Sequence, residues 1–223
     1  MTQKKAISNL DTVIQKIEFS RLQKSQHHIV QLVAISKYST AEDIAMLYKA
    51  GQRAFGENKV QDLKEKQKQL QDLPISWHFV GTLQKNKINN LIDCEPVLFH
   101  SLDSLELAYE LDKKLKSKDK TMNCLLQINS ANEESKSGVS PKEAKAIYDE
   151  IKQNCTNIVL KGVMSIGAHS DDKELIKQSF KTTYDIFTTL DDATVCSMGM
   201  SGDFDIAILE GSTMVRVGSA LFK

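Results

Sequence analysis

The feature that most constrains the fold of this 223-residue chain is a regular alternation of short apolar runs with helical segments. Eight of the runs have the length and composition of buried strands. They occupy residues 30–35, 53–55, 76–80, 97–99, 124–128, 158–163, 194–196 and 214–217. Because helical crossovers join parallel strands with a right-handed winding, this order predicts an α/β fold with one parallel sheet.

The segments between the runs carry recognisable helix signals. Residues 39–42 form a capping box, and residues 140–143 place a capping serine, a first-turn proline and an acidic third residue in sequence. A helix is also expected from about residue 201 to residue 209. One more helix precedes the first strand, and its predicted buried face consists of Ile7, Leu10, Ile14 and Ile17.

Two architectures fit this order, a closed barrel and an open doubly wound sheet. The count of eight strands favours the barrel, and the chain lacks the Gly-x-Gly-x-x-Gly turn that opens a dinucleotide-binding sheet. We therefore predict α/β architecture in the form of a single (β/α)8 TIM-type barrel domain over residues 1–223, with an extra N-terminal helix.

Charge and cysteine content exclude several classes of protein. Lysine and arginine total 29, as do aspartate and glutamate, so the chain lacks the basic footprint of a nucleic-acid binder. It shows no secretory signal, no apolar run long enough for a membrane span and no histidine or cysteine spacing typical of a metal site. Its four cysteines are far apart and are predicted to be reduced core residues. We expect a cytoplasmic protein with neither nucleic-acid nor membrane partners.

Polar residues follow the predicted first strand, where a barrel of this type carries its site. Lys37 comes directly after the buried run and is expected to be partly desolvated. Desolvation disfavours the ammonium form, so the amine becomes available for a Schiff base with a carbonyl compound.

A second cluster lies near the other end of the chain. Ser201 is expected at a helix N-terminus, where free N–H groups and the helix dipole favour an anion. Gly218 allows close approach of backbone amides and Ser219 adds a hydroxyl, so these residues predict a phosphate site after the last two strands. Arg216 belongs to the last strand, and an inward-pointing guanidinium there needs a partner.

A carbonyl-reactive lysine opposite a phosphate site suggests a ligand that is both an aldehyde and a phosphate ester. Pyridoxal 5′-phosphate (PLP) has this chemistry, and Arg216 would then face its pyridine nitrogen. Because arginine stays cationic, it favours the unprotonated ring nitrogen and a weaker electron sink.

The chain resembles the pyridoxal phosphate homeostasis proteins, whose fold is similar to the barrel domain of alanine racemase. The resemblance runs from about residue 32 to residue 222. Its motifs are Val33-Ala-Ile-Ser-Lys37, Phe55-Gly-Glu-Asn58, Trp77-His-Phe-Val-Gly81, Gln127-Ile-Asn129, Ser197-Met-Gly-Met-Ser201 and Gly211-Ser-Thr213 with Arg216 and Gly218.

The resemblance implies that Lys37 carries the Schiff base and that Ser201, Gly218 and Ser219 hold the phosphate, with Arg216 near the ring nitrogen. It also implies that Asn58 and His78 are neighbours of the ring. Lys136 matches a lysine on a loop near the barrel mouth, with a secondary role.

The resemblance favours a carrier that maintains the intracellular PLP supply without robust turnover, with PLP-dependent apoenzymes as candidate recipients. The alternative is a PLP-dependent amino-acid racemase or decarboxylase of the alanine racemase fold type. Alanine racemases add a C-terminal β domain that supplies an opposite-face base. This chain ends five residues after Gly218, so we expect no such domain and a monomer. A class I aldolase is a further alternative, although its lysine usually lies on a later strand than Lys37.

Overall fold

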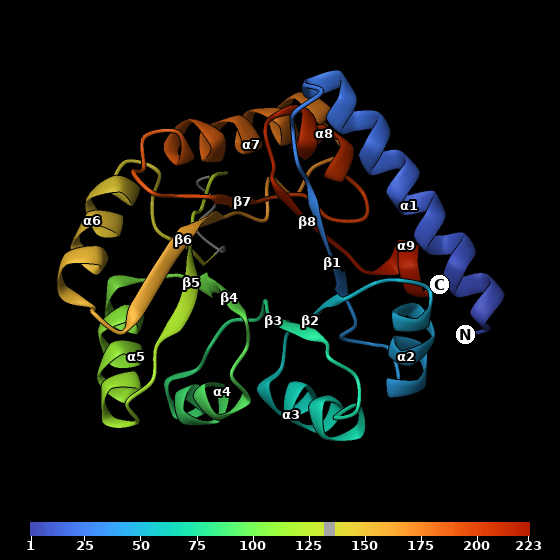
Figure 1. The fold of residues 1–223 in the computed structure, drawn as a ribbon. Helices are drawn as coiled ribbons and strands as arrows, with labels where there is room; N and C mark the ends of the chain where they lie inside the picture. Colours follow the sequence, from blue (N-terminus) through green and yellow to red (C-terminus); the bar gives the residue numbers. More distant parts are fainter. Residues whose placement is uncertain (132–136) are drawn as a thin grey trace.

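The computed structural model describes residues 1–131 and 137–223, and eight parallel strands close into one barrel (Figure 1). Each strand pairs with the next along the chain, and β1 pairs with β8 to complete the circle. The strands are β1 (Gln31–Ile35), β2 (Ala54–Glu57), β3 (Ser76–Phe79), β4 (Leu98–Leu102), β5 (Met122–Gln127), β6 (Ile158–Met164), β7 (Val195–Ser197) and β8 (Met214–Val217). This closure confirms the predicted TIM-type barrel and excludes the open sheet.

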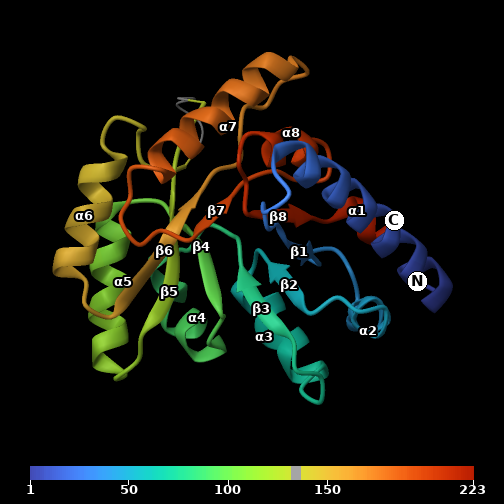
Figure 2. The ribbon, with the colours of Figure 1, turned by 45° about the horizontal axis from the view of Figure 1, so that its top comes forward.

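Helices cover the outside of the barrel (Figures 1 and 2). They are α1 (Gln3–Lys24), α2 (Ala41–Lys49), α3 (Val60–Gln69), the 3-10 turn η1 (Lys85–Lys87), α4 (Ile88–Cys94), α5 (Leu105–Ser117), α6 (Ala144–Asn154), α7 (Lys173–Phe187), α8 (Phe204–Leu209) and α9 (Ser219–Phe222). The capping box expected at residues 39–42 forms one residue further along the chain, because Thr40 is the N-cap of α2 and its hydroxyl accepts a hydrogen bond from the Asp43 amide.

Two helix starts lie further along the chain than the sequence predicted. The helix expected from residue 140 begins at Ala144, because Val139 is still paired with Ile128 and residues 141–143 form a turn closed by the Glu143 amide on the Ser140 carbonyl. The helix expected from about residue 201 begins at Phe204. Both starting signals therefore belong to turns that precede the helices.

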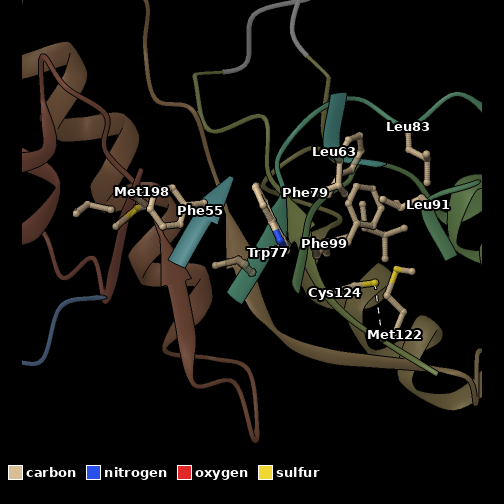
Figure 3. Packing of buried hydrophobic residues seen from close by; sticks show 14 of the residues in the cluster. Phe55, Leu63, Trp77, Phe79, Leu83, Leu91, Phe99, Met122, Cys124 and Met198 are labelled. Carbon is tan, nitrogen blue, oxygen red and sulfur yellow. Dashed lines mark hydrogen bonds between the residues drawn. The ribbon is translucent and has the colours of Figure 1, made fainter. Parts of the chain in front are cut away.

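The apolar core has an inner and an outer layer, as the alternating directions of strand side chains require. The inner layer lies inside the barrel and contains Val33, Leu98, Leu125, Met164 and Met214. The larger outer layer lies between the strands and the helices, and Figure 3 shows part of it around Phe79 and Phe99, whose ring centroids are 5.8 Å apart. All four cysteines are buried and none is in a disulfide, which confirms the prediction that they are core residues.

The N-terminal helix packs across the seam where β1 meets β8. It contacts α8, α9 and α2, and both chain termini lie on this side of the molecule (Figures 1 and 2). The predicted buried face of this helix was partly wrong, because Ile7 and Ile14 are 44% and 43% exposed. Its buried residues are Ala6, Leu10, Val13, Ile17 and Ser20.

Within the described residues 1–131 and 137–223, no helix has both the length and the apolar character that a bilayer crossing requires.

Candidate functional site

A cavity of about 480 Å³ opens at the carboxyl ends of β1 and β8. Because these two strands are paired, residues from the beginning and the end of the sequence meet there. Five of the seven residues predicted to bind the cofactor line it, namely Lys37, Ser201, Arg216, Gly218 and Ser219. The sequence therefore identified residues that the fold brings to one cavity.

The loops after β7 and β8 form a narrow, polar corner of this cavity. The Ser201 hydroxyl accepts a hydrogen bond from the Gly218 amide at 3.2 Å, which joins the two loops. A Cβ atom at Gly218 would lie 3.2 Å from the Ile35 carbonyl oxygen, so a side chain would crowd this corner. With the Ser219 hydroxyl also lining the cavity, the corner has the small residues and donors suited to an anion.

Arg216 places a buried cation at the floor of the cavity. Its Nη1 donates to the Ser197 hydroxyl at 2.7 Å and its Nη2 donates to the Ser165 carbonyl at 2.8 Å. Burial lowers the pKa of Arg216 to about 10, although the nearby Asp203 carboxylate opposes this shift. Among the described residues no carboxylate lies within ion-pairing distance of the guanidinium, so its remaining N–H groups can serve a ligand.

Lys37 lines the same cavity but is an exposed residue. Its Nζ lies 5.1 Å from the centroid of the Tyr38 ring, which is a cation–π contact. The expected partial desolvation of this amine is therefore not present, because the side chain extends over Tyr38 at the barrel rim and not into the barrel.

The remaining predicted residues lie outside this cavity. Asn58 follows β2 at the same end of the barrel but is not among the lining residues. His78 belongs to β3, lies inside the barrel and lines a separate hollow at the amino ends of the strands. Lys136 lies outside the described residues.

A buried ion pair beside Lys37 was not anticipated from the sequence. The Glu57 carboxylate is fully buried, and its Oε1 accepts hydrogen bonds from the Ser36 hydroxyl at 2.5 Å and from Lys66 Nζ at 2.7 Å. Lys66 Nζ also donates to the Ser36 carbonyl at 2.8 Å, so the residue before Lys37 is fixed from two sides. Glu57 belongs to the motif at residues 55–58, so the sequence marked this residue. Nothing in the sequence indicated that Lys66 would be its partner.

Comparison with known proteins agrees with this geometry. The family model described as the N-terminal domain of alanine racemase matches residues 13–223. A protein of Helicobacter pylori named pyridoxal phosphate homeostasis protein is 52% identical over 214 residues, which cover 96% of each chain. The chain belongs to the pyridoxal phosphate homeostasis protein family. The resemblance inferred from its motifs is thereby confirmed.

Other proteins are similar to this chain in sequence or in fold. The human protein of that name is 36% identical over 211 residues, covering 86% of this chain and 75% of its own. The structure of PipY from Synechococcus elongatus with PLP bound has a TM-score of 0.84 at 30% identity and covers 98% of this chain and 100% of its own. An alanine racemase of Clostridium difficile has a TM-score of 0.77 at 16% identity, with 96% of this chain and 59% of its own covered, and shares the fold.

Proposed function

We propose that this chain, as a single domain over residues 1–223, binds PLP reversibly through Lys37 and maintains the intracellular PLP supply without robust turnover. The observation that carries the proposal is the single cavity that Lys37 shares with Arg216 and the Ser201–Gly218 corner. The names of the homologues and the PLP-bound structure of PipY support the same ligand.

The cavity residues match the three functional groups of PLP. Ser201, Gly218 and Ser219 would hold the phosphate, and Arg216 would donate to the ring nitrogen. The Lys37 amine would condense with the aldehyde to form a C=N bond, with release of one water molecule. Because Lys37 is exposed, water can reach this bond and reverse the reaction, which suits a carrier.

The same residues argue against strong catalysis. A cationic Arg216 favours the unprotonated ring nitrogen, so a bound cofactor would be a weaker electron sink than one paired with a carboxylate. The Asp43 carboxylate lines the cavity but is engaged by the Met1 amino group. The observation that favours a racemase or a decarboxylase is the exposed Tyr38 phenol in the same cavity, which could exchange protons with a substrate.

The proposed ligand is tested by spectroscopy of the purified protein incubated with PLP. We expect a visible band, loss of that band on borohydride reduction, and a tryptic peptide modified at Lys37. In Lys37→Ala the covalent adduct should be lost while weaker phosphate-anchored binding persists. The matched control is Lys59→Ala, which removes an exposed lysine outside the cavity and should behave as the wild type. A wild-type protein that stays colourless with PLP contradicts the proposal.

The carrier role is tested separately from the ligand. Racemisation and decarboxylation are assayed with each common amino acid and with PLP-loaded protein. Turnover of about 1 s⁻¹ or more, within the range of ordinary enzymes, would favour the enzymatic alternative.

We further propose that PLP-dependent apoenzymes in the cytoplasm receive the cofactor from a monomeric carrier. Four buried, unpaired cysteines fit a compartment that keeps thiols reduced. An apoenzyme should be activated by PLP-loaded protein in the presence of a scavenger of free PLP. If the scavenger abolishes activation completely, then transfer is not direct.

A further inference from the structure

Four buried polar side chains form a continuous hydrogen-bonded chain through the interior of the barrel. His78 Nδ1 lies 2.9 Å from His100 Nε2, and His100 Nδ1 lies 3.2 Å from the Ser197 hydroxyl. The Ser197 hydroxyl in turn accepts from Arg216 Nη1 at 2.7 Å. These residues come from β3, β4, β7 and β8, and none is more than 6% exposed.

The chain connects the two ends of the barrel. Arg216 lines the candidate cofactor cavity at the carboxyl ends of the strands. His78 lines the hollow at the amino ends, together with the beginnings of several strands. The interior of a barrel of this type is ordinarily filled by apolar side chains, so a row of four polar groups is an arrangement that packing alone does not require.

The guanidinium fixes the direction of every bond in the chain. Arginine is a donor only, so the Ser197 oxygen must accept from Arg216, and its own proton then has His100 Nδ1 as acceptor. His100 therefore carries its proton on Nε2 and donates it to His78 Nδ1, which leaves the His78 proton on Nε2. The reverse direction would leave the buried Ser197 proton without an acceptor.

Burial keeps both rings in the form that this direction requires. It lowers the pKa of His78 to about 4 and the pKa of His100 well below its ordinary value, and Arg216 contributes to the lowering at His100. At neutral pH both rings are neutral, so Arg216 is the one charged member of the chain. The neutral Ser197 hydroxyl therefore orients the guanidinium and leaves its positive charge intact, whereas a carboxylate in its place would neutralise that charge.

We propose that Ser197 and His100 are positioning residues that orient Arg216 toward the ring nitrogen of the cofactor, and that His78 fixes the tautomer of His100. This inference rests on the proposed binding of PLP. The Ser165 carbonyl holds the second nitrogen of Arg216, so together the two contacts fix the plane of the guanidinium. Loss of the Ser197 contact should let that plane turn away from the ring.

The first test uses the unliganded wild-type protein and does not involve PLP. Nitrogen-15 NMR of the histidine rings at pH 7.5 should show His78 and His100 neutral, with protonated Nε2 and unprotonated Nδ1. An Nδ1–H tautomer on either ring would reverse the chain and overturn the proposal.

The second test compares PLP with its 1-deaza analogue, in which a C–H group replaces the ring nitrogen. Wild-type protein should bind PLP more tightly than the analogue. Ser197→Ala should weaken PLP binding about tenfold and leave binding of the analogue unchanged, because the lost contact acts only through the ring nitrogen. The matched control is Ser101→Ala, which removes another buried barrel serine, whose hydroxyl donates a hydrogen bond to the Val80 carbonyl.

Variants at His100 add a conservative replacement. His100→Asn keeps an acceptor for the Ser197 hydroxyl and should retain PLP affinity within about threefold, whereas His100→Leu should lose about tenfold. If Ser197→Ala weakens PLP and the analogue equally, its role is structural and the proposal is overturned. If the wild type binds neither compound, the proposed function itself fails, so the two failures are distinguishable.

Discussion

At the scale of single residues, the buried pair His78 and His100 should make the stability of the unliganded protein depend on pH. Both side chains have a pKa near 6.5 when unfolded, and burial lowers that of His78 to about 4 in the folded state. Between these values the unfolded chain binds more protons, so the free energy of unfolding decreases as pH falls. At pH 5 His78 alone should reduce that free energy by about 2 kcal/mol relative to pH 7.

Urea unfolding at pH 7 and pH 5 measures this effect. His78→Phe removes the titrating ring and should reduce the loss of stability between the two pH values, whereas His27→Ala, at an exposed position, should not. An equal loss of stability in His78→Phe and the wild type would contradict the attribution of the pH dependence to the lowered pKa of His78.

Gly81 is a second residue for which the structure predicts a large effect. A Cβ atom there would lie 2.0 Å from the Asn58 carbonyl oxygen, and a backbone atom cannot move aside as a flexible side chain can. Gly81→Ala should therefore lower the free energy of unfolding by at least about 2 kcal/mol in denaturant titrations. Gly202→Ala, with nothing within 4 Å of the added atom, should change it by less than about 0.5 kcal/mol.

Single residues also mark the limit of the sequence argument. An inward Arg216 was recognised as needing a partner, but its partners are a hydroxyl on β7 and a backbone carbonyl after β6. A hydroxyl carries no sequence signal of its pairing, because Ser197 approaches Arg216 only after β7 and β8 are aligned in the closed barrel. Likewise, the exposure of Lys37 depends on its rotamer over Tyr38, which strand position does not determine.

At the scale of elements, α1 should contribute to stability through one narrow face. Leu10 is 3% exposed, whereas Ile14 on the same helix is 43% exposed. Leu10→Ala should lower the free energy of unfolding by about 2–4 kcal/mol through lost burial and a cavity, and Ile14→Ala by less than about 1 kcal/mol. Comparable losses in the two variants, measured by denaturant unfolding, would contradict the packing described for this helix.

Periodicity predicted the elements better than it predicted their ends. All eight strands and the helices between them were recognised, because buried runs and amphipathic faces repeat over many residues. The start of α6 and the buried face of α1 were not, since each depends on a few residues. The capping pattern at residues 140–143 is also compatible with a turn, and here it forms the turn before α6. On α1, the apolar face through Ala6 and Val13 is buried in place of the face through Ile7 and Ile14, and the sequence pattern allowed either.

At the scale of the whole molecule, strand pairing is uneven around the barrel. β5 and β6 are aligned from Met122 and Ile158 through Gln127 and Met164, whereas β7 and β8 are aligned only at Ser197 and Met214. The candidate cavity lies at the carboxyl ends of β1 and β8, which are aligned from Gln31 and Met214 through Ala34 and Val217. The sequence placed both halves of the site at strand ends and predicted that they face one ligand, and closure of the barrel through β1 and β8 brings them to one cavity.

A ligand that bridges Lys37 and the Ser201–Gly218 corner should therefore stabilise this seam. With free PLP at 100 times its dissociation constant, binding adds about 2.7 kcal/mol to the free energy of unfolding. We expect amide hydrogen exchange in β1, β8 and α9 to slow more than in β4 and β5, because local opening of the seam would require release of the ligand. Lys37→Ala should show less of this protection at the same PLP concentration, since it loses the covalent bond and keeps only the contacts to the phosphate and the ring nitrogen. Equal slowing of exchange in the seam and in β4 and β5, measured by mass spectrometry with and without PLP, would contradict a ligand bound across the seam.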